Sequence, residues 1–141
     1  LIRCLKADAP LIAFSEPDFG GRIDFPADLK PLCDWQIESL QRRGGHPLIG
    51  REIAHQFHQS GLERIRSSVM GGEWEIAQSI ASYQAEWDLL LDDLSHLDSF
   101  DTEEFERLTT RADAFAAIGT RIFFVPTFST IGWKSAQESR H

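Results

Sequence analysis

The sequence contains few cysteines and no long apolar run. Its two cysteines, Cys4 and Cys33, form neither a Cys-x-x-Cys pair nor the spacing of zinc ligands. We therefore expect two reduced thiols, as in a cytoplasmic protein. No apolar stretch approaches the roughly 20 residues needed to cross a bilayer, and no signal peptide is recognisable. These absences argue against a secreted protein and against a membrane partner.

Basic residues are also scarce. The 141 residues include 14 Lys and Arg against 22 Asp and Glu, which gives a net charge of -8. An acidic chain repels phosphate backbones, so we expect no nucleic-acid partner. Hydrophobic residues make up 42% of the chain and aromatic residues 11%. That content supports a folded core, and the length is typical of one domain.

The glycines do not form a nucleotide-binding loop. No Gly-x-Gly-x-x-Gly occurs, and the pairs Gly20-Gly21, Gly44-Gly45 and Gly71-Gly72 are typical of turns. The acidic residues between Glu86 and Glu106 lack the Asp-x-Asp-x-Asp-Gly pattern of a calcium loop. We interpret them as the solvated faces of a helix pair.

Hydrophobic spacing predicts the elements of the first half of the chain. Leu11 to Phe14 is apolar on both faces, which is typical of a strand in a parallel sheet covered by helices. Three further elements are predicted, namely a helix from Asp28 to Arg43, a helix from Ile49 to Ser60 and a strand from Leu62 to Met70. Gly61 is placed to end the second helix.

The second half is predicted to be mainly helical. Apolar residues spaced by three and four predict a long helix between Ile76 and Leu97. Asp101, with a glutamate three residues later, predicts the start of another helix, which runs to Ala117. Arg121 to Val125 has the composition of a strand, and Pro126 predicts a bulge or a sheet edge.

These elements make an incomplete α/β domain, because about three strands cannot form a sheet that packs so many helices. The chain also begins in the middle of an element, since Leu1 to Lys6 has the spacing of a last helical turn. We expect the C-terminal part of a larger domain. Its parts are residues 1–70 (strand-helix-helix-strand), 71–119 (helical insertion), 120–134 (closing strand) and 135–141 (a polar tail).

The segment around the first strand resembles a known family. Leu5-Lys6 followed by Leu11 to Asp18, with its Glu16-Pro17, resembles the fourth helix end and fifth strand of class I S-adenosylmethionine-dependent methyltransferases. Lys6 to Pro10 stands in place of the family's usual Pro-Gly-Gly turn. Later segments are similar to the family's sixth strand with its preceding helix, its helical insertion and its closing strand, namely Gly50 to Met70, Asp101 to Ala117 and Arg121 to Lys134.

The resemblance implies a doubly wound, Rossmann-like sheet, of which this chain holds about three strands, the last of them antiparallel, with a helical insertion or lid. It implies a transferase that moves a methyl group from S-adenosylmethionine to a small molecule. The family's glycine-rich cofactor loop precedes the fifth strand, so residues upstream of this chain would hold most of the cofactor. We expect the chain alone to be inactive, and no residue of it is assigned to the cofactor.

Glu16 is the catalytic candidate. Ligands of doubly wound sheets bind beyond the carboxyl ends of the strands, and a carboxylate there can orient a substrate or accept a proton. Asp18, Phe19 and Tyr83 are the candidates for contacts with the small-molecule methyl acceptor. The alternative is a solvated loop in which Asp18 contacts its own backbone.

Two alternatives concern metal ions and partner proteins. His55 and His58 can share a helix face, but nothing supplies a convincing third ligand. We expect no metal, because neighbouring histidines more often lie on a solvated face. Trp74, Tyr83 and Trp87 are typical of interface anchors and suit a homodimer. The alternative function is therefore a non-catalytic helical dimerisation or interaction module.

Overall fold

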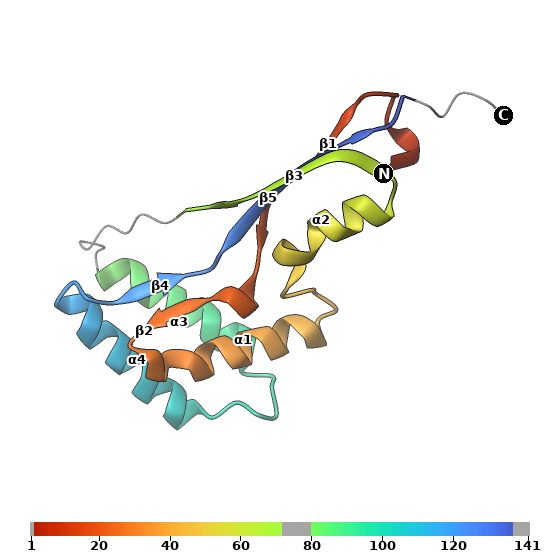
Figure 1. The fold of residues 1–141 in the computed structure, drawn as a ribbon. Helices are drawn as coiled ribbons and strands as arrows, with labels where there is room; N and C mark the ends of the chain where they lie inside the picture. The colour runs from red at the N-terminus through yellow and green to blue at the C-terminus, as the bar shows by residue number, and fades with distance from the viewer. Residues whose placement is uncertain (1, 72–79, 137–141) are drawn as a thin grey trace. The chain divides into compact units, whose positions relative to one another are not determined.

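The computed structural model describes residues 2–71 and 80–136, and for residues 80–86 it describes only the backbone. The chain folds into two compact units, each built from separate stretches of sequence (Figure 1). The sheet unit comprises Leu1–Asp18, Leu48–Gly71 and Pro126–His141, and the helical unit comprises Phe19–Pro47 and Gly72–Val125. Residues that are distant in sequence therefore meet within each unit.

The sheet unit contains a three-stranded sheet. Its strands are β1 (Pro10–Pro17), β3 (Leu62–Met70) and β5 (Thr127–Lys134), in the order β1-β5-β3. β5 pairs antiparallel with both neighbours, so β1 and β3 run in the same direction. The parallel pairing predicted for the first strand is therefore wrong, because the strand bonded to β1 is the antiparallel β5.

Helix α2 (Ile49–Gln59) covers one face of this sheet and contacts all three strands (Figure 1). Phe57 of α2 is buried against the sheet. A Cβ at Gly132 of β5 would lie 3.2 Å from the Phe57 ring and 3.2 Å from Cβ of Leu62. The missing side chain at Gly132 therefore lets the helix approach the central strand closely.

The side chains of β1 alternate between the two faces of the sheet. Leu11 pairs with Gly132 and is half-buried on the side of α2. Ile12 and Phe14 are 56% and 69% exposed. The expectation that helices cover both faces of this strand is therefore wrong for the part of the chain that the structure describes.

The helical unit contains a small sheet and a group of helices. Strands β2 (Ile23–Phe25) and β4 (Ile122–Phe124) pair antiparallel. The helices are α1 (Lys30–Arg42), α3 (Ile80–Leu94) and α4 (Thr102–Ala117). Among the described residues, their core is a cluster of buried side chains, formed by Leu29, Leu32, Trp87, Leu90, Leu94, Leu97, Phe105, Leu108 and Ala112. The chain as a whole is thus mixed α/β, as the sequence predicts.

Several predicted elements are confirmed. The strand predicted from Leu62 to Met70 coincides with β3, and the helix predicted from Ile49 coincides with α2 apart from its last residue. Gly61 has a φ of +79°, the left-handed conformation that suits a glycine after a helix. The Asp101 side chain accepts hydrogen bonds from two backbone N–H groups in the first turn of α4, which confirms the predicted cap.

The predicted closing strand at residues 120–134 is two strands that belong to different sheets. β4 pairs with β2, whereas β5 pairs with β1 and β3. Pro126 lies between them and has no N–H to donate to a sheet. Its carbonyl oxygen accepts a hydrogen bond from the N–H of Asp18 at 2.8 Å. The proline therefore ends one ladder before the next begins.

Two further predictions differ from the structure in extent. β2 is absent from the predicted elements, because three residues give almost no periodicity. The predicted long helix ends at Leu94 in the structure. Its expected start at Ile76 and the polar tail after residue 136 lie outside the described residues.

None of the helices in the described ranges is both long and apolar enough to cross a membrane.

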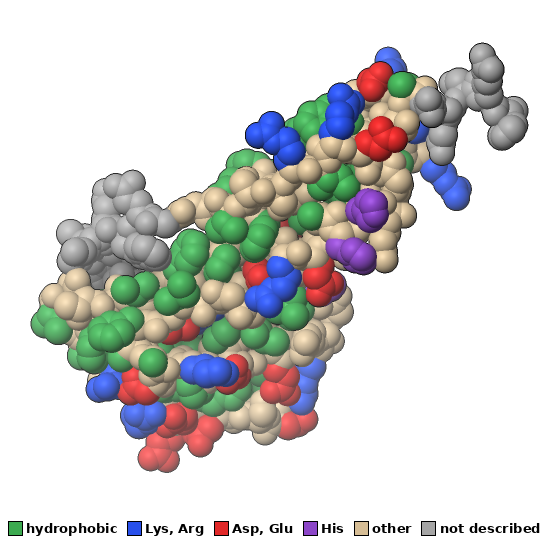
Figure 2. Space-filling view, in the orientation of Figure 1, with side chains coloured by type: hydrophobic (Ala, Val, Ile, Leu, Met, Phe, Trp, Pro, Cys, Tyr) green, Lys and Arg blue, Asp and Glu red, His purple; other side chains and the backbone are tan. Residues whose placement is uncertain are grey.

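Figure 2 shows Lys and Arg side chains interspersed among Asp and Glu on the face drawn. Hydrophobic side chains also reach the surface on this face.

Candidate functional site

Glu16 lies near the carboxyl end of β1, where the regular pairing with β5 is interrupted. The register shifts between Ala13 and Glu16, and Ser15 has a φ of +67°, which is uncommon outside glycine. After this bulge Glu16 pairs with Phe128, so the two side chains share one face of the sheet. The Glu16 residue is half-buried. The bulge therefore sets the direction of the Glu16 carboxylate.

Gly50 brings the first turn of α2 against the end of β1. A Cβ at Gly50 would lie 2.7 Å from the carbonyl oxygen of Glu16 and 2.7 Å from Cδ2 of Phe128. It would also lie 3.0 Å from the carbonyl oxygen of Pro17. Heavy atoms do not pack this closely, so the contact requires glycine. The start of the helix and the end of the strand thus form one close junction beside Glu16.

Asp18 is buried at the same junction. The residue is 3% exposed, and both of its carboxylate oxygens accept hydrogen bonds from Arg51 of α2. The distances are 2.6 Å from Nε and 2.9 Å from Nη2. The hydrogen bond to Asp18 raises the pKa of Arg51, which therefore stays charged. A substrate group that uses Asp18 must compete with this ion pair.

The other two substrate-binding candidates belong to the helical unit. Phe19 is half-buried and lines a cavity of about 360 Å³ together with Asp24 and Cys33. The Cys33 thiol donates a hydrogen bond to the carbonyl oxygen of Phe19 at 3.4 Å. Burial raises the pKa of Cys33, so the thiol stays protonated at neutral pH. The side chain of Tyr83 lies outside the described part of the chain.

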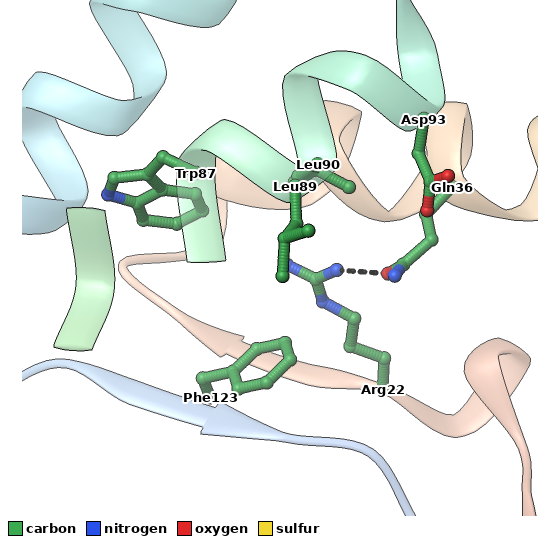
Figure 3. Close-up of a pocket in the computed structure, with 7 residues that line it drawn as sticks. All are labelled: Arg22, Gln36, Trp87, Leu89, Leu90, Asp93 and Phe123. Carbon is green, nitrogen blue, oxygen red and sulfur yellow. Dashed lines mark hydrogen bonds between the residues drawn. The ribbon is translucent and has the colours of Figure 1, made fainter. Parts of the chain in front are cut away.

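The sequence interpretation missed a buried ion pair in β2 and its preceding turn. The side chains of Arg22 and Asp24 are 2% and 7% exposed, and Asp24 accepts hydrogen bonds from Nε and Nη2 of Arg22 at 2.7 and 2.8 Å. Nη1 of Arg22 donates to the side-chain oxygen of Gln36 at 2.9 Å (Figure 3). The only sequence signal is the alternation Arg22-Ile23-Asp24, which places both charges on one side of a strand.

Aromatic rings and charged groups alternate around this ion pair. The guanidinium of Arg22 lies 4.6 Å from the centroid of the Phe123 ring, and that of Arg121 lies 5.7 Å from the same ring. Arg121 also lies 4.6 Å from the Trp87 ring, whose indole N–H donates to Asp113 at 2.9 Å. Cation–π contacts of this kind link β4 to α3 and to β2.

The structure gives no support for the metal site considered for α2. His55 and His58 are both exposed on this helix. Among the described residues, no group of three or more His, Cys, Asp or Glu side chains is arranged to hold a metal ion.

No protein-family model matches the chain, and no curated protein matches it. Its own residues therefore carry the functional argument. At the end of β1 they offer one half-buried carboxylate, Glu16, beside an ion pair that fixes Asp18 and Arg51. Such a carboxylate can accept a proton or orient a polar group of a ligand.

Proposed function

We propose that this chain is the substrate-side, C-terminal portion of an S-adenosylmethionine-dependent methyltransferase that acts on a small molecule. The resemblance of Leu11 to Asp18, Gly50 to Met70 and the closing segment to that family supports the proposal, since these segments occur in the family's order. The upstream part of the protein would hold the cofactor. The chain described here would shape the site of the methyl acceptor.

The arrangement of the sheet is the observation that carries this proposal. β5 lies between β1 and β3 and pairs antiparallel with both, which agrees with the antiparallel last strand that the resemblance implies. The last residues of β1 and β3, Pro17 and Met70, both pair with Thr127. The carboxyl ends of these two strands therefore lie at the same end of the sheet. Doubly wound sheets bind ligands beyond the carboxyl ends of their strands.

Glu16 has the chemistry that the acceptor half of such an enzyme requires. A sulfonium methyl group needs a nucleophile aligned with it and, where the nucleophile carries a proton, a base that removes the proton. Glu16 lies near the carboxyl end of β1, and the bulge at Ser15 and the contact of Gly50 hold its backbone in place. We assign Glu16 as the base or the orienting group, and Asp18 as the anchor of α2 beside it.

The first experiment asks what precedes Leu1 in the encoding reading frame. We expect an upstream strand, glycine-rich loop and helix, and we expect the extended polypeptide to bind S-adenosylmethionine in a calorimetric titration. An extended polypeptide that binds no S-adenosylmethionine would overturn the proposal. Tight binding by the present chain alone would contradict the assignment of the cofactor contacts to upstream residues.

The second experiment tests Glu16 in the extended protein. Glu16→Gln keeps the size of the side chain but removes the base, so we expect turnover to fall by roughly 100-fold or more. The matched control is Glu63→Gln, an exposed glutamate on β3 whose loss is expected to leave turnover unchanged. Equal turnover of Glu16→Gln and wild type would remove Glu16 from the site.

Exposed apolar residues of the helical unit favour the alternative of a non-catalytic dimerisation module. Leu89 is 72% exposed and Ile118 is 70% exposed, whereas the proposed anchor Trp87 is only 5% exposed. Exposed apolar side chains mark a protein interface where they form a contiguous patch. Light scattering over a range of protein concentrations tests this alternative, which predicts a dimer that Ile118→Glu converts to a monomer. A monomer at every concentration would exclude the homodimer.

A further inference from the structure

The helical unit contains a second cavity, of about 150 Å³, beside the buried ion pair of Arg22 (Figure 3). Its apolar lining is formed by Trp87, Leu89 and Leu90 of α3 and by Phe123 of β4 (Figure 3). Trp87 and Leu90 are 5% and 7% exposed, while Leu89 is 72% exposed. A cavity of this volume has the size that holds one benzene-sized ring.

Arg22 supplies unused hydrogen-bond donors to this cavity. A guanidinium has five N–H donors, and Arg22 uses three of them, two with Asp24 and one with Gln36. One N–H on Nη1 and one on Nη2 thus have no hydrogen-bond partner among the described residues. The Arg22 side chain is only 2% exposed, so water has little access to these donors. Buried donors of this kind favour a ligand that carries an acceptor.

The charges around the cavity favour a neutral ligand. Asp24 already neutralises Arg22 through two hydrogen bonds. Asp93, which also lines the cavity, forms an ion pair with Arg43 at 2.9 Å. Each charged residue that lines the cavity is thus already paired with a group of opposite charge, so a carboxylate ligand would compete with Asp24 for Arg22 and would lie near Asp93. A neutral oxygen acceptor pays no such electrostatic penalty.

We propose that this cavity binds a small neutral aromatic molecule with a hydrogen-bond-accepting oxygen, of which a phenol is the simplest example. The ring lies against Trp87 and Phe123, and the oxygen accepts a hydrogen bond from the guanidinium of Arg22. Offset or edge-on contacts between rings favour a planar ligand over an aliphatic one of similar size. This site does not depend on methyl transfer, because it needs only residues of the helical unit.

The test uses the full chain and three probes, namely phenol, benzoate and cyclohexanol, measured by saturation-transfer NMR and calorimetry. Phenol is expected to bind about tenfold more tightly than benzoate, because benzoate carries a negative charge. It is also expected to bind about tenfold more tightly than cyclohexanol, because the cyclohexanol ring is not planar. Leu89→Trp places a large ring at the cavity and is expected to weaken phenol binding by about tenfold or more. This residue is exposed, so the variant is expected to fold.

Leu91→Trp is the matched control, because Leu91 lies on the same helix, is 38% exposed and does not line the cavity. Its phenol binding is expected to equal that of the wild type. The proposal is overturned if phenol gives no saturation transfer at millimolar concentration, or if Leu89→Trp binds phenol as the wild type does. Benzoate binding as tight as phenol binding would overturn the neutral class of ligand.

Discussion

Arg51 donates two hydrogen bonds to the buried carboxylate of Asp18, from Nε at 2.6 Å and from Nη2 at 2.9 Å. Asp18 directly follows β1, and Arg51 lies in the first turn of α2. The ion pair therefore joins the end of a strand to the start of the helix that covers it. Two parallel hydrogen bonds between guanidinium and carboxylate also fix the relative orientation of the two groups.

Replacing Asp18 with alanine is expected to lower the urea midpoint of unfolding clearly, because both charged hydrogen bonds are lost at a buried position. The control is Arg64→Ala. Arg64 pairs with Asp8 at 3.3 Å, and both side chains are at least 60% exposed. The Arg64 guanidinium also lies 5.1 Å from the centroid of the Trp133 ring. Exposed ion pairs and exposed cation–π contacts each contribute about 1 kcal/mol or less, so this variant is expected to lose much less stability than Asp18→Ala. A smaller effect for Asp18→Ala than for Arg64→Ala would contradict the anchoring role.

Gly50→Ala is expected to destabilise the protein by about 1–3 kcal/mol, as overpacking does. The added Cβ would meet two carbonyl oxygens of β1 and the ring of Phe128, none of which is the flexible end of a long side chain. Gln59→Ala, an exposed change on the same helix, serves as the control and is expected to have almost no effect. Urea unfolding followed by circular dichroism measures both, and equal stability of the two variants would refute the close junction.

The sequence predicts those features of the fold that depend on residues close together in the chain. The spacing of apolar residues defines α2 and β3, and the single residues Gly61 and Asp101 mark where a helix ends and begins. Each of these signals lies within one helix, one turn or one strand. Local periodicity and capping chemistry therefore suffice for them.

Pairings between distant residues are not predictable in the same way. The order β1-β5-β3 depends on hydrogen bonds between the two ends of the chain. The contact of Arg51 with Asp18 spans 33 residues, and that of Gln36 with Arg22 spans 14. No periodicity encodes such partners, because each residue alone is typical of a solvated surface. The sequence predicts that Glu16 lies at the end of a strand, but it does not predict the bulge that directs the Glu16 side chain.

The cap of α4 gives a further test of a confirmed prediction. Oδ1 of Asp101 accepts hydrogen bonds from the N–H groups of Glu103 at 2.9 Å and Glu104 at 3.1 Å. Asp101→Ala leaves both donors to water and is expected to cost about 1 kcal/mol. Asp98→Ala is the matched control, since this carboxylate is 92% exposed and lies before the helix. Thermal unfolding that cannot distinguish the two variants would exclude a capping role.

The two cysteines are expected to differ in reactivity. Cys4 is exposed, whereas Cys33 is 8% exposed and its thiol donates a hydrogen bond to the carbonyl oxygen of Phe19. A thiol reagent attacks the thiolate, and burial both hides Cys33 and raises its pKa. Mass spectrometry of the native protein is expected to find a label at Cys4 alone, with Cys33 labelled only after urea is added. Equal labelling rates in the native protein would contradict the buried position of Cys33.

The raised pKa of Cys33 also makes stability depend on pH. Burial raises this pKa above its ordinary value of 9.0, so the folded state holds the thiol proton more tightly than the unfolded chain does. This contribution to stability is therefore complete at pH values below the ordinary pKa of the thiol. It is lost as the pH rises from that ordinary pKa to the raised pKa of the folded state.

Urea unfolding measures this loss. Between about pH 8 and about pH 10, the stability of the wild type is expected to fall more than that of Cys33→Ala, which has no thiol proton to release. Cys4→Ala keeps Cys33 and is expected to follow the wild type. The same pH dependence in all three proteins would mean that the Cys33 thiol titrates alike in the folded and unfolded states.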